Sequence, residues 1–258
     1  MTAILIHGAW QGSWAWNALL PWFAEAGIAA QAVDLPGNGS DNTPAAKVSL
    51  ELYVAHLGDA IAQSDGPVQL IAHSGGGVIA SQAAERFRDR VAGIVYVAGM
   101  MLPDGGSFAD VVNGLVDAGE AAAGIRPHLQ WSPDRSTTIV PAAAARDIFY
   151  HDCTAADAEA ACARLTPQPE GGRAISPRLT SQRFGTVPRL YVEALQDRSL
   201  ILATQRRMQQ LVPGSNVVSL DSGHAPQLSM PGRLAGCIIP WLKAPAASLP
   251  AQALLPFM

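Results

Sequence analysis

Charged side chains are scarce in this chain of 258 residues. They make up 15% of it, against about 25% in an average soluble domain. This scarcity excludes a disordered or solvating role, which depends on high charge and low hydrophobicity. Basic residues are scattered, and the net charge is −4. Asp89 dilutes the one local group, Arg86, Arg88 and Arg90, so the chain lacks a basic footprint for nucleic acid or anionic lipid.

Long apolar runs are also lacking, although the mean hydropathy is +0.16. The longest run covers residues 94–102, nine residues that include Gly99, whereas a membrane-spanning helix needs about 20. No basic segment followed by an apolar one opens the chain, so no signal peptide is visible. We therefore expect a cytoplasmic protein without a membrane partner.

Cysteine is rare, with Cys153, Cys162 and Cys237 as its only instances. The odd number and the absence of zinc-ligand spacing indicate buried or free thiols. A pair between Cys153 and Cys162 stays open. We expect neither a structural metal nor a cofactor.

Apolar strands and helices alternate along most of the chain. The expected strands span residues 3–6, 28–33, 68–73, 91–98, 189–194 and 216–220. The expected helices span residues 14–26, 200–211 and 232–242, with two more after Ser49 and Ser74. Residues 68–73 and 91–98 are continuously apolar, as in strands covered on both faces. The pattern predicts a doubly wound α/β fold with about six mostly parallel strands.

This alternation lapses between residues 104 and 185, where helical patches at 108–118 and 155–165 are mixed with Pro, Gly and Arg. We expect a core of residues 1–103 and 186–243, with 104–185 as a helical lid insertion over one end of the sheet. Residues 244–258 form a Pro- and Ala-rich tail. The tail could pack on the core, contact a second subunit or be disordered, so a homodimer is left open.

The segment Ala72-His73-Ser74-Gly75-Gly76-Gly77 directly follows an apolar strand and opens a helix. A serine between very small residues can occupy a sharp strand-to-helix turn, where its hydroxyl stands clear of the sheet edge. Ala72 takes the place of the first glycine of the usual Gly-x-Ser-x-Gly pattern. A phosphate-binding loop is the alternative, but the dinucleotide glycine spacing and the Walker lysine are both absent. We therefore take Ser74 as the candidate nucleophile.

A serine nucleophile needs a base, and the chain has six histidines. His224 lies in a loop just past the last predicted strand. Parallel strands deliver the loops at their carboxyl ends to one edge of the sheet, so this loop can reach Ser74. His224 is thus the expected general base. A surface histidine in a turn is the alternative.

The base in turn needs an orienting acid. Asp197 follows the strand that ends at Ala194 and completes the chain order Ser, Asp, His. Asp104, which follows another strand, is its rival. Asp34 precedes a Pro-Gly turn on a different loop, and we expect a structural role for it.

An oxyanion needs hydrogen-bond donors. His7-Gly8-Ala9-Trp10 follows the first strand, beside the strand that leads to Ser74 if the winding is conventional. The backbone N–H groups of Ala9 and Gly75 are the expected pair. Gly8 leaves the backbone free to turn. An ordinary strand-to-helix loop is the alternative.

These motifs together resemble the α/β-hydrolase branch that contains plant methylesterases, hydroxynitrile lyases and related bacterial carboxylesterases. Residues 7–16 match its His-Gly-Ala and Gly-x-Trp-x-Trp signature, and residues 34–39, 102–104 and the three loops above also match. The resemblance implies an α/β-hydrolase fold, a lid that shapes the pocket, and acyl transfer without a cofactor. In the related lyases a threonine replaces Gly8 and a lysine replaces Ala225, which favours ester hydrolysis here.

The substrate is expected to be an apolar, medium-to-bulky small-molecule ester. We expect the pocket to be lined by Trp10, Met100, Met101, Trp131, Phe149 and Tyr150, although these side chains could instead form the small core of the lid. The lid arginines Arg126 and Arg178 could bind a carboxylate or be solvated. A carbon–carbon lyase acting on cyanohydrins and a non-catalytic ligand binder remain alternatives to the esterase.

Overall fold

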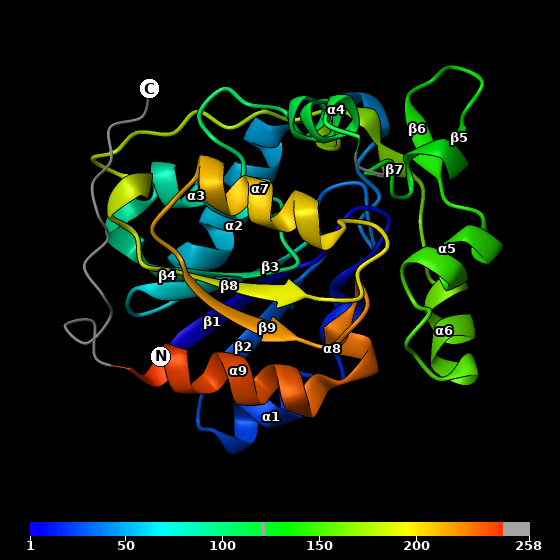
Figure 1. The fold of residues 1–258 in the computed structure, drawn as a ribbon. Coiled ribbons are helices and arrows are strands. Elements are labelled where there is room, and N and C mark those ends of the chain that lie inside the picture. Colours follow the sequence, from blue (N-terminus) through cyan, green and yellow to red (C-terminus); the bar gives the residue numbers. More distant parts are fainter. Residues whose placement is uncertain (120–121, 245–258) are drawn as a thin grey trace.

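A computed structural model describes residues 1–119 and 122–244 and contains one large sheet of six strands in the order β2-β1-β3-β4-β8-β9 (Figure 1). Every neighbouring pair in it is parallel. The doubly wound α/β sheet expected from the sequence is therefore confirmed. Its strands are β1 (Thr2–Ile6), β2 (Ala29–Val33), β3 (Val68–His73), β4 (Val91–Val97), β8 (Arg189–Ala194) and β9 (Asn216–Leu220).

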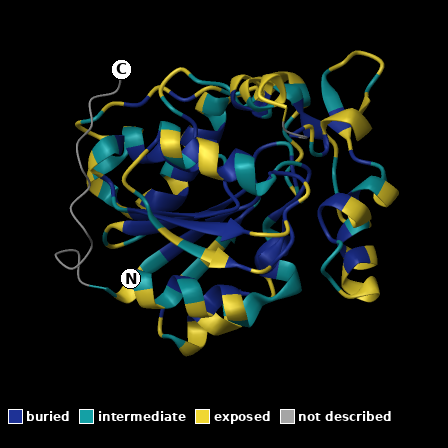
Figure 2. Ribbon diagram, in the orientation of Figure 1, coloured by how far each residue is buried: buried dark blue, intermediate teal, exposed yellow. Residues whose placement is uncertain are grey.

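Helices cover both faces of this sheet. They are α1 (Leu20–Glu25), α2 (Leu50–Ala62), α3 (Gly76–Arg86), α7 (Leu202–Leu211), α8 (Pro226–Ser229) and α9 (Pro231–Lys243). Side chains of α2 and α3 pack on one face and those of α9 on the other. Figure 2 shows the inner strands between these layers as buried, whereas the edge strands β2 and β9 carry exposed residues. Burial on both faces explains why β3 and β4 are apolar without alternation.

Two predicted helix starts differ in outcome. As expected, Ser49 caps α2, because its hydroxyl accepts a hydrogen bond from the Leu52 N–H. The single helix expected over residues 14–26 is instead a 3-10 helix (Ser13–Trp16) followed by α1. Pro21 lies in the first turn of α1, where its missing N–H breaks no helical hydrogen bond. Further 3-10 helices span Ala45–Lys47, Arg88–Arg90, Arg126–His128, Glu170–Gly172 and Phe184–Thr186.

Residues 104–185, here called the insertion segment, contain both helices and strands. Its elements are α4 (Phe108–Asp117), β5 (Gln130–Trp131), β6 (Thr137–Ile139), α5 (Ala142–Ile148), α6 (Ala155–Cys162) and β7 (Gln168–Pro169). The two helical patches are present, but a purely helical insertion is wrong because β5, β6 and β7 form an antiparallel sheet. Strands of two or three residues are too short to show a period in the sequence.

The small sheet, α5 and α6 lie beyond the arrowheads of β8 and β9 in Figure 1, at the end of the main sheet where the loops following the strands emerge. The division into core and lid stays a prediction. The tail expected at residues 244–258 lies outside the described residues, apart from Ala244.

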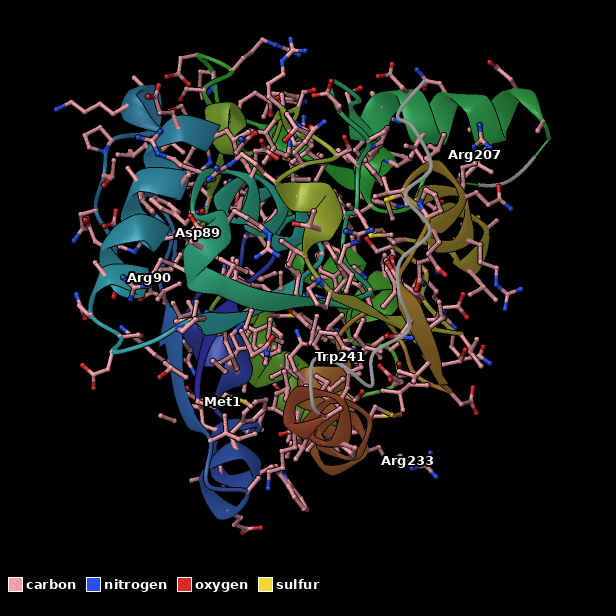
Figure 3. The ribbon with its side chains drawn as sticks, turned by 90° about the vertical axis from the view of Figure 1, so that its left-hand side faces the viewer. Met1, Asp89, Arg90, Arg207, Arg233 and Trp241 are labelled. Carbon is pink, nitrogen blue, oxygen red and sulfur yellow. The ribbon has the colours of Figure 1, made fainter. Side chains whose placement is uncertain are left out.

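Two further observations concern the helices and the basic side chains of the described residues. In the described residues no helix combines the length and apolarity needed to cross a membrane. Figure 3, which views the side opposite the small sheet, α5 and α6, shows Arg90, Arg207 and Arg233 on separate parts of the molecule, with Asp89 beside Arg90. Arg90 also donates to the carbonyls of Ile61 and Ser64 at the end of α2.

Candidate active site

Ser74 occupies a strained turn between β3 and α3. Its φ is +50°, a left-handed conformation that a residue other than glycine adopts only when its surroundings hold it there. Its carbonyl accepts hydrogen bonds from the N–H groups of Gly77 (3.0 Å) and Met100 (2.8 Å). A Cβ built on Gly76 would lie 2.6 Å from the His7 carbonyl oxygen. The small residues around Ser74 therefore allow the turn to pack tightly against its neighbours.

His224 lies within hydrogen-bond reach of Ser74. It follows β9, and its Nε2 is 3.2 Å from the Ser74 hydroxyl oxygen. Its Nδ1 is 2.7 Å from Oδ2 of Asp197, and both side chains of this pair are buried. A histidine that donates from Nδ1 to the carboxylate keeps Nε2 free to accept the serine proton. The structure thus brings together the three residues predicted from separate loops.

Asp197 is held rigidly in the loop after β8. Its Oδ1 accepts hydrogen bonds from the N–H groups of Ser199 (2.7 Å) and Leu200 (2.9 Å), which leaves Oδ2 for His224. The rival carboxylate, Asp104, accepts a hydrogen bond from the Leu179 N–H at 2.9 Å, so its role is a backbone contact. It ties the first residue of the insertion segment to Leu179, near the end of the same segment.

Asp34 has the structural role expected of it. It accepts hydrogen bonds from the backbone of Ser13 (2.6 Å) and from the backbone and hydroxyl of Ser40. Partial burial opposes ionisation, but these hydrogen bonds outweigh it and lower the pKa of Asp34 to about 2. The carboxylate thereby fixes the turn that follows β2.

The predicted oxyanion donors lie next to each other beside Ser74. A Cβ built on Gly75 would lie 3.8 Å from the Ala9 nitrogen, and both residues line the same cavity as Ser74. A Cβ built on Gly8 would lie 2.9 Å from Cβ of Ser74. Any side chain at position 8 would therefore displace the serine or the loop that carries Gly8.

Two buried residues that were not predicted as site residues support the loop of His224. His73 lies with its Nε2 2.8 Å from the His224 carbonyl oxygen and its Nδ1 3.0 Å from the side-chain amide of Gln11. Burial, reinforced by the nearby His224, lowers the pKa of His73 well below its usual value, so it is a neutral donor to the His224 carbonyl. Its position next to the candidate nucleophile was the available signal.

A cavity of about 390 Å³ opens at Ser74, a volume within the range of sites that bind small molecules. Its walls are largely apolar and include Leu35, Val78, Ile79, Leu102, Phe108 and Ile125. Leu35 and Leu102 follow the ends of β2 and β4, and Leu200 follows β8. Because these leucines follow strand ends, the sequence could have predicted that they line the cavity.

The predicted pocket residues divide into two groups. Trp10 and Met100 line the cavity. The other four, Met101, Trp131, Phe149 and Tyr150, are not among the described residues that line it.

Each of these four packs elsewhere. Met101 belongs to the core on one face of the main sheet. Trp131 is partly exposed on β5, with Arg135 and Arg173 over its ring. Phe149 stacks on the His224 ring with 5.2 Å between the ring centroids, and the Tyr150 hydroxyl accepts from Gln11 Nε2 at 3.3 Å.

The neighbouring methionines allow a matched test of the cavity. Met100→Ala enlarges the cavity, so we expect kcat/KM to rise for larger esters relative to smaller ones by about tenfold, the effect of a few methylene groups of packing. Met101→Ala should lower stability and leave this ratio unchanged. A series of p-nitrophenyl esters of increasing acyl length measures both. An unchanged ratio in Met100→Ala would remove Met100 from the substrate-binding wall.

The three cysteines are free thiols, so Cys153 and Cys162 are not paired. Of the two lid arginines proposed as carboxylate ligands, Arg126 lies at the cavity. Arg178 is not among the described residues that line it, and its backbone N–H donates to Oε1 of Gln82. Within the described ranges, no group of three or more His, Cys, Asp or Glu side chains is arranged to hold a metal ion.

Comparison with known proteins gives consistent matches along almost the whole chain. A family model described as the alpha/beta hydrolase family matches residues 3–236. A pyrethroid hydrolase from Sphingobium wenxiniae is 32% identical, over 94% of this chain and 88% of that protein. A putative chloroplastic methylesterase 14 from Arabidopsis thaliana is 28% identical, over 90% and 69% respectively.

Solved structures are similar in the same way. A pyrethroid hydrolase from Sphingobium faniae superposes with a TM-score of 0.85 and 30% identity, over 96% of this chain and 99% of that one. Polyneuridine aldehyde esterase superposes with a TM-score of 0.83 over 94% and 99%, and its 22% identity makes this a likeness of fold.

Proposed function

Given that this chain belongs to the alpha/beta hydrolase family and is a carboxylic ester hydrolase, we propose that Ser74, His224 and Asp197 are its catalytic triad. The observation that supports this is the continuous hydrogen-bonded chain from Asp197 through His224 to the Ser74 hydroxyl. It joins loops that lie about 150 residues apart in sequence, and Ser74 at its end lines the cavity.

The proposed reaction is acyl transfer in two halves. His224 Nε2 takes the hydroxyl proton as Ser74 Oγ attacks the ester carbonyl carbon, and Asp197 stabilises the imidazolium. The Ala9 and Gly75 N–H groups bind the resulting oxyanion. His224 then gives the proton to the alcohol oxygen as the carbon–oxygen bond breaks. Water, deprotonated by His224, releases the acid from Ser74 in the second half.

We propose apolar esters of medium to large size as substrates. Support comes from the largely apolar cavity of about 390 Å³ and from similarity to an enzyme named for its action on pyrethroids. A pyrethroid is therefore the informative bulky test ester. Two positions argue against the lyase alternative. The space at Gly8 is too tight for the threonine of the related lyases. The residue after His224 is the buried Ala225, and no lysine lies near His224 in sequence.

A fluorophosphonate probe tests the proposal directly. Ser74 Oγ should displace fluoride from phosphorus, so we expect loss of ester hydrolysis in step with labelling of the peptide that contains Ser74. Ser81→Ala is the matched control, because the Ser81 hydroxyl is buried against Tyr96 and should not react.

Labelling should persist in the Ser81→Ala variant and vanish in Ser74→Ala. Stoichiometric labelling at any other residue, or full hydrolysis by Ser74→Ala, would contradict the proposed nucleophile. Cyanide release from mandelonitrile measures the lyase alternative. Ligand-dependent thermal stabilisation with no turnover across the ester series would favour the binder.

A further inference from the structure

Trp10, the residue after the proposed oxyanion donor Ala9, has an unusual backbone conformation. Its φ is +62°, in the left-handed region that bulky residues rarely enter. Such a conformation persists only where the surrounding structure imposes it. Whatever holds Trp10 therefore also holds the peptide next to the Ala9 N–H.

The contacts that hold Trp10 come from the insertion segment. Its backbone N–H donates to Oε1 of Gln168 at 3.0 Å, and its carbonyl accepts from the Thr166 N–H at 2.9 Å. Its indole N–H donates to the carbonyl of Thr138 at 3.1 Å. Thr138 and Gln168 face each other in the register of β6 and β7. Residues of the small sheet thus form hydrogen bonds with both the main chain and the side chain of Trp10.

Gln168 is suited to this task because its amide can point only one way. It is buried, with 2% of its surface exposed. Its Nε2 donates to the Tyr53 hydroxyl and to the Pro169 carbonyl, each at 3.2 Å. With both donor hydrogens engaged, Oε1 must face the Trp10 N–H. A buried backbone N–H needs such an acceptor.

We infer that Gln168 is a positioning residue for the oxyanion hole, acting through Trp10 on the N–H of Ala9. Without the Gln168 oxygen, the Trp10 N–H would have no acceptor, and the peptide between Ala9 and Trp10 would turn to find one. The Ala9 N–H would then leave the position beside Gly75 where an oxyanion forms. This inference rests on the proposed function of Ala9 and Gly75.

Gln168→Met tests the inference, because methionine has a similar length and offers no comparable acceptor. Loss of a full oxyanion donor costs about 10²–10³ in kcat, so a displaced donor should lower kcat by about 10- to 50-fold. KM should stay within about threefold, since the effect falls on the transition state. The inhibition constant of a trifluoromethyl ketone, whose adduct with Ser74 carries an oxyanion, should rise by the same factor as kcat falls.

Two further variants separate positioning from general packing. Tyr53→Phe removes a partner of the same Gln168 amide and leaves the bond to Trp10 in place. Tyr53 also lines the cavity, so KM is free to change in this variant, whereas kcat should stay within about threefold of wild type. Gln168→Glu restores an oxygen acceptor for the Trp10 N–H and should recover most of the kcat that Gln168→Met loses. It also serves if the methionine variant does not fold.

The outcomes distinguish this inference from the function on which it rests. A wild-type chain that hydrolyses no ester and resists fluorophosphonate would overturn the proposed function. An active wild-type chain would overturn the inference alone in any of three cases. Gln168→Met could keep wild-type kcat and ketone affinity, change KM only, or lose no more kcat than Tyr53→Phe.

Discussion

Replacing Asp197 with asparagine is expected to lower kcat for ester hydrolysis by about 10⁴-fold. The reason lies in the two N–H groups, of Ser199 and Leu200, that donate to Oδ1. They will keep the amide oxygen of Asn in that place and turn its NH₂ group towards His224. The imidazole must then accept at Nδ1 and carry its proton on Nε2, where it cannot take the proton of Ser74.

Asp104→Asn is the matched control, because it makes the same change at the rival carboxylate. The amide oxygen can still accept from the Leu179 N–H, so kcat should stay within about threefold of wild type. Both variants should unfold near the wild-type temperature in a thermal melt. Equal losses in the two variants, or an Asp197→Asn variant with wild-type kcat, would remove Asp197 from the role of orienting acid.

The sequence predicted well that Ser74, Asp197 and His224 lie together, because their places depend on the sheet alone. The predicted bounds of β3, β8 and β9 agree with the strand ends in the structure. Once the ends are known, parallel order places the next few residues at one edge. Ser74, Asp197 and His224 each lie within four residues of such an end, so no knowledge of packing was needed to bring them together.

The pocket could not be predicted in the same way. Met100 and Met101 are chemically identical neighbours, yet one lines the cavity and the other is in the core. Which side each methionine takes depends on the turn of the backbone after β4. Phe149 and Tyr150 contact His224 and Gln11, and the apolar composition of the segment does not indicate these positions.

The insertion segment also contacts the loops that carry the residues of the proposed triad. The His151 imidazole donates to the Gln196 carbonyl at 3.0 Å, and Asp152 accepts from the Gly223 N–H at 2.6 Å. These are the loops of Asp197 and His224. Because the insertion segment makes these hydrogen bonds and also those to Trp10, changes in this segment should alter kcat as well as the range of esters that are hydrolysed.

Acid is expected to destabilise the protein through its buried histidines. His7 donates from Nδ1 to the Gly8 carbonyl and accepts at Nε2 from the Leu35 N–H, so its neutral form is the one that fits. Burial lowers its pKa from 6.5 to about 4, although Asp34 nearby favours the charged form. The unfolded chain therefore binds a proton between pH 6.5 and pH 4 that the folded chain does not bind.

This difference in proton binding means that the free energy of unfolding falls as the pH is lowered. Stability from His7 is present above pH 6.5 and is lost as the pH falls towards 4. From pH 7.5 to pH 5.0 the loss should be about 2 kcal/mol, and His73, whose pKa burial also lowers, adds to it with the same sign. Asp34 contributes only below about pH 4, because its pKa is already lowered to about 2.

Denaturant unfolding at pH 7.5 and pH 5.0 measures this loss. His7→Gln places an amide oxygen where Nε2 accepts from Leu35 and cannot be protonated, so its loss of stability between the two pH values should be smaller by about 2 kcal/mol. His128→Gln, at an exposed histidine, should behave as wild type. A free energy of unfolding that is equal at the two pH values in wild type would show that His7 is charged in the folded protein. It would then have to donate from both ring nitrogens, which the Leu35 N–H at Nε2 forbids.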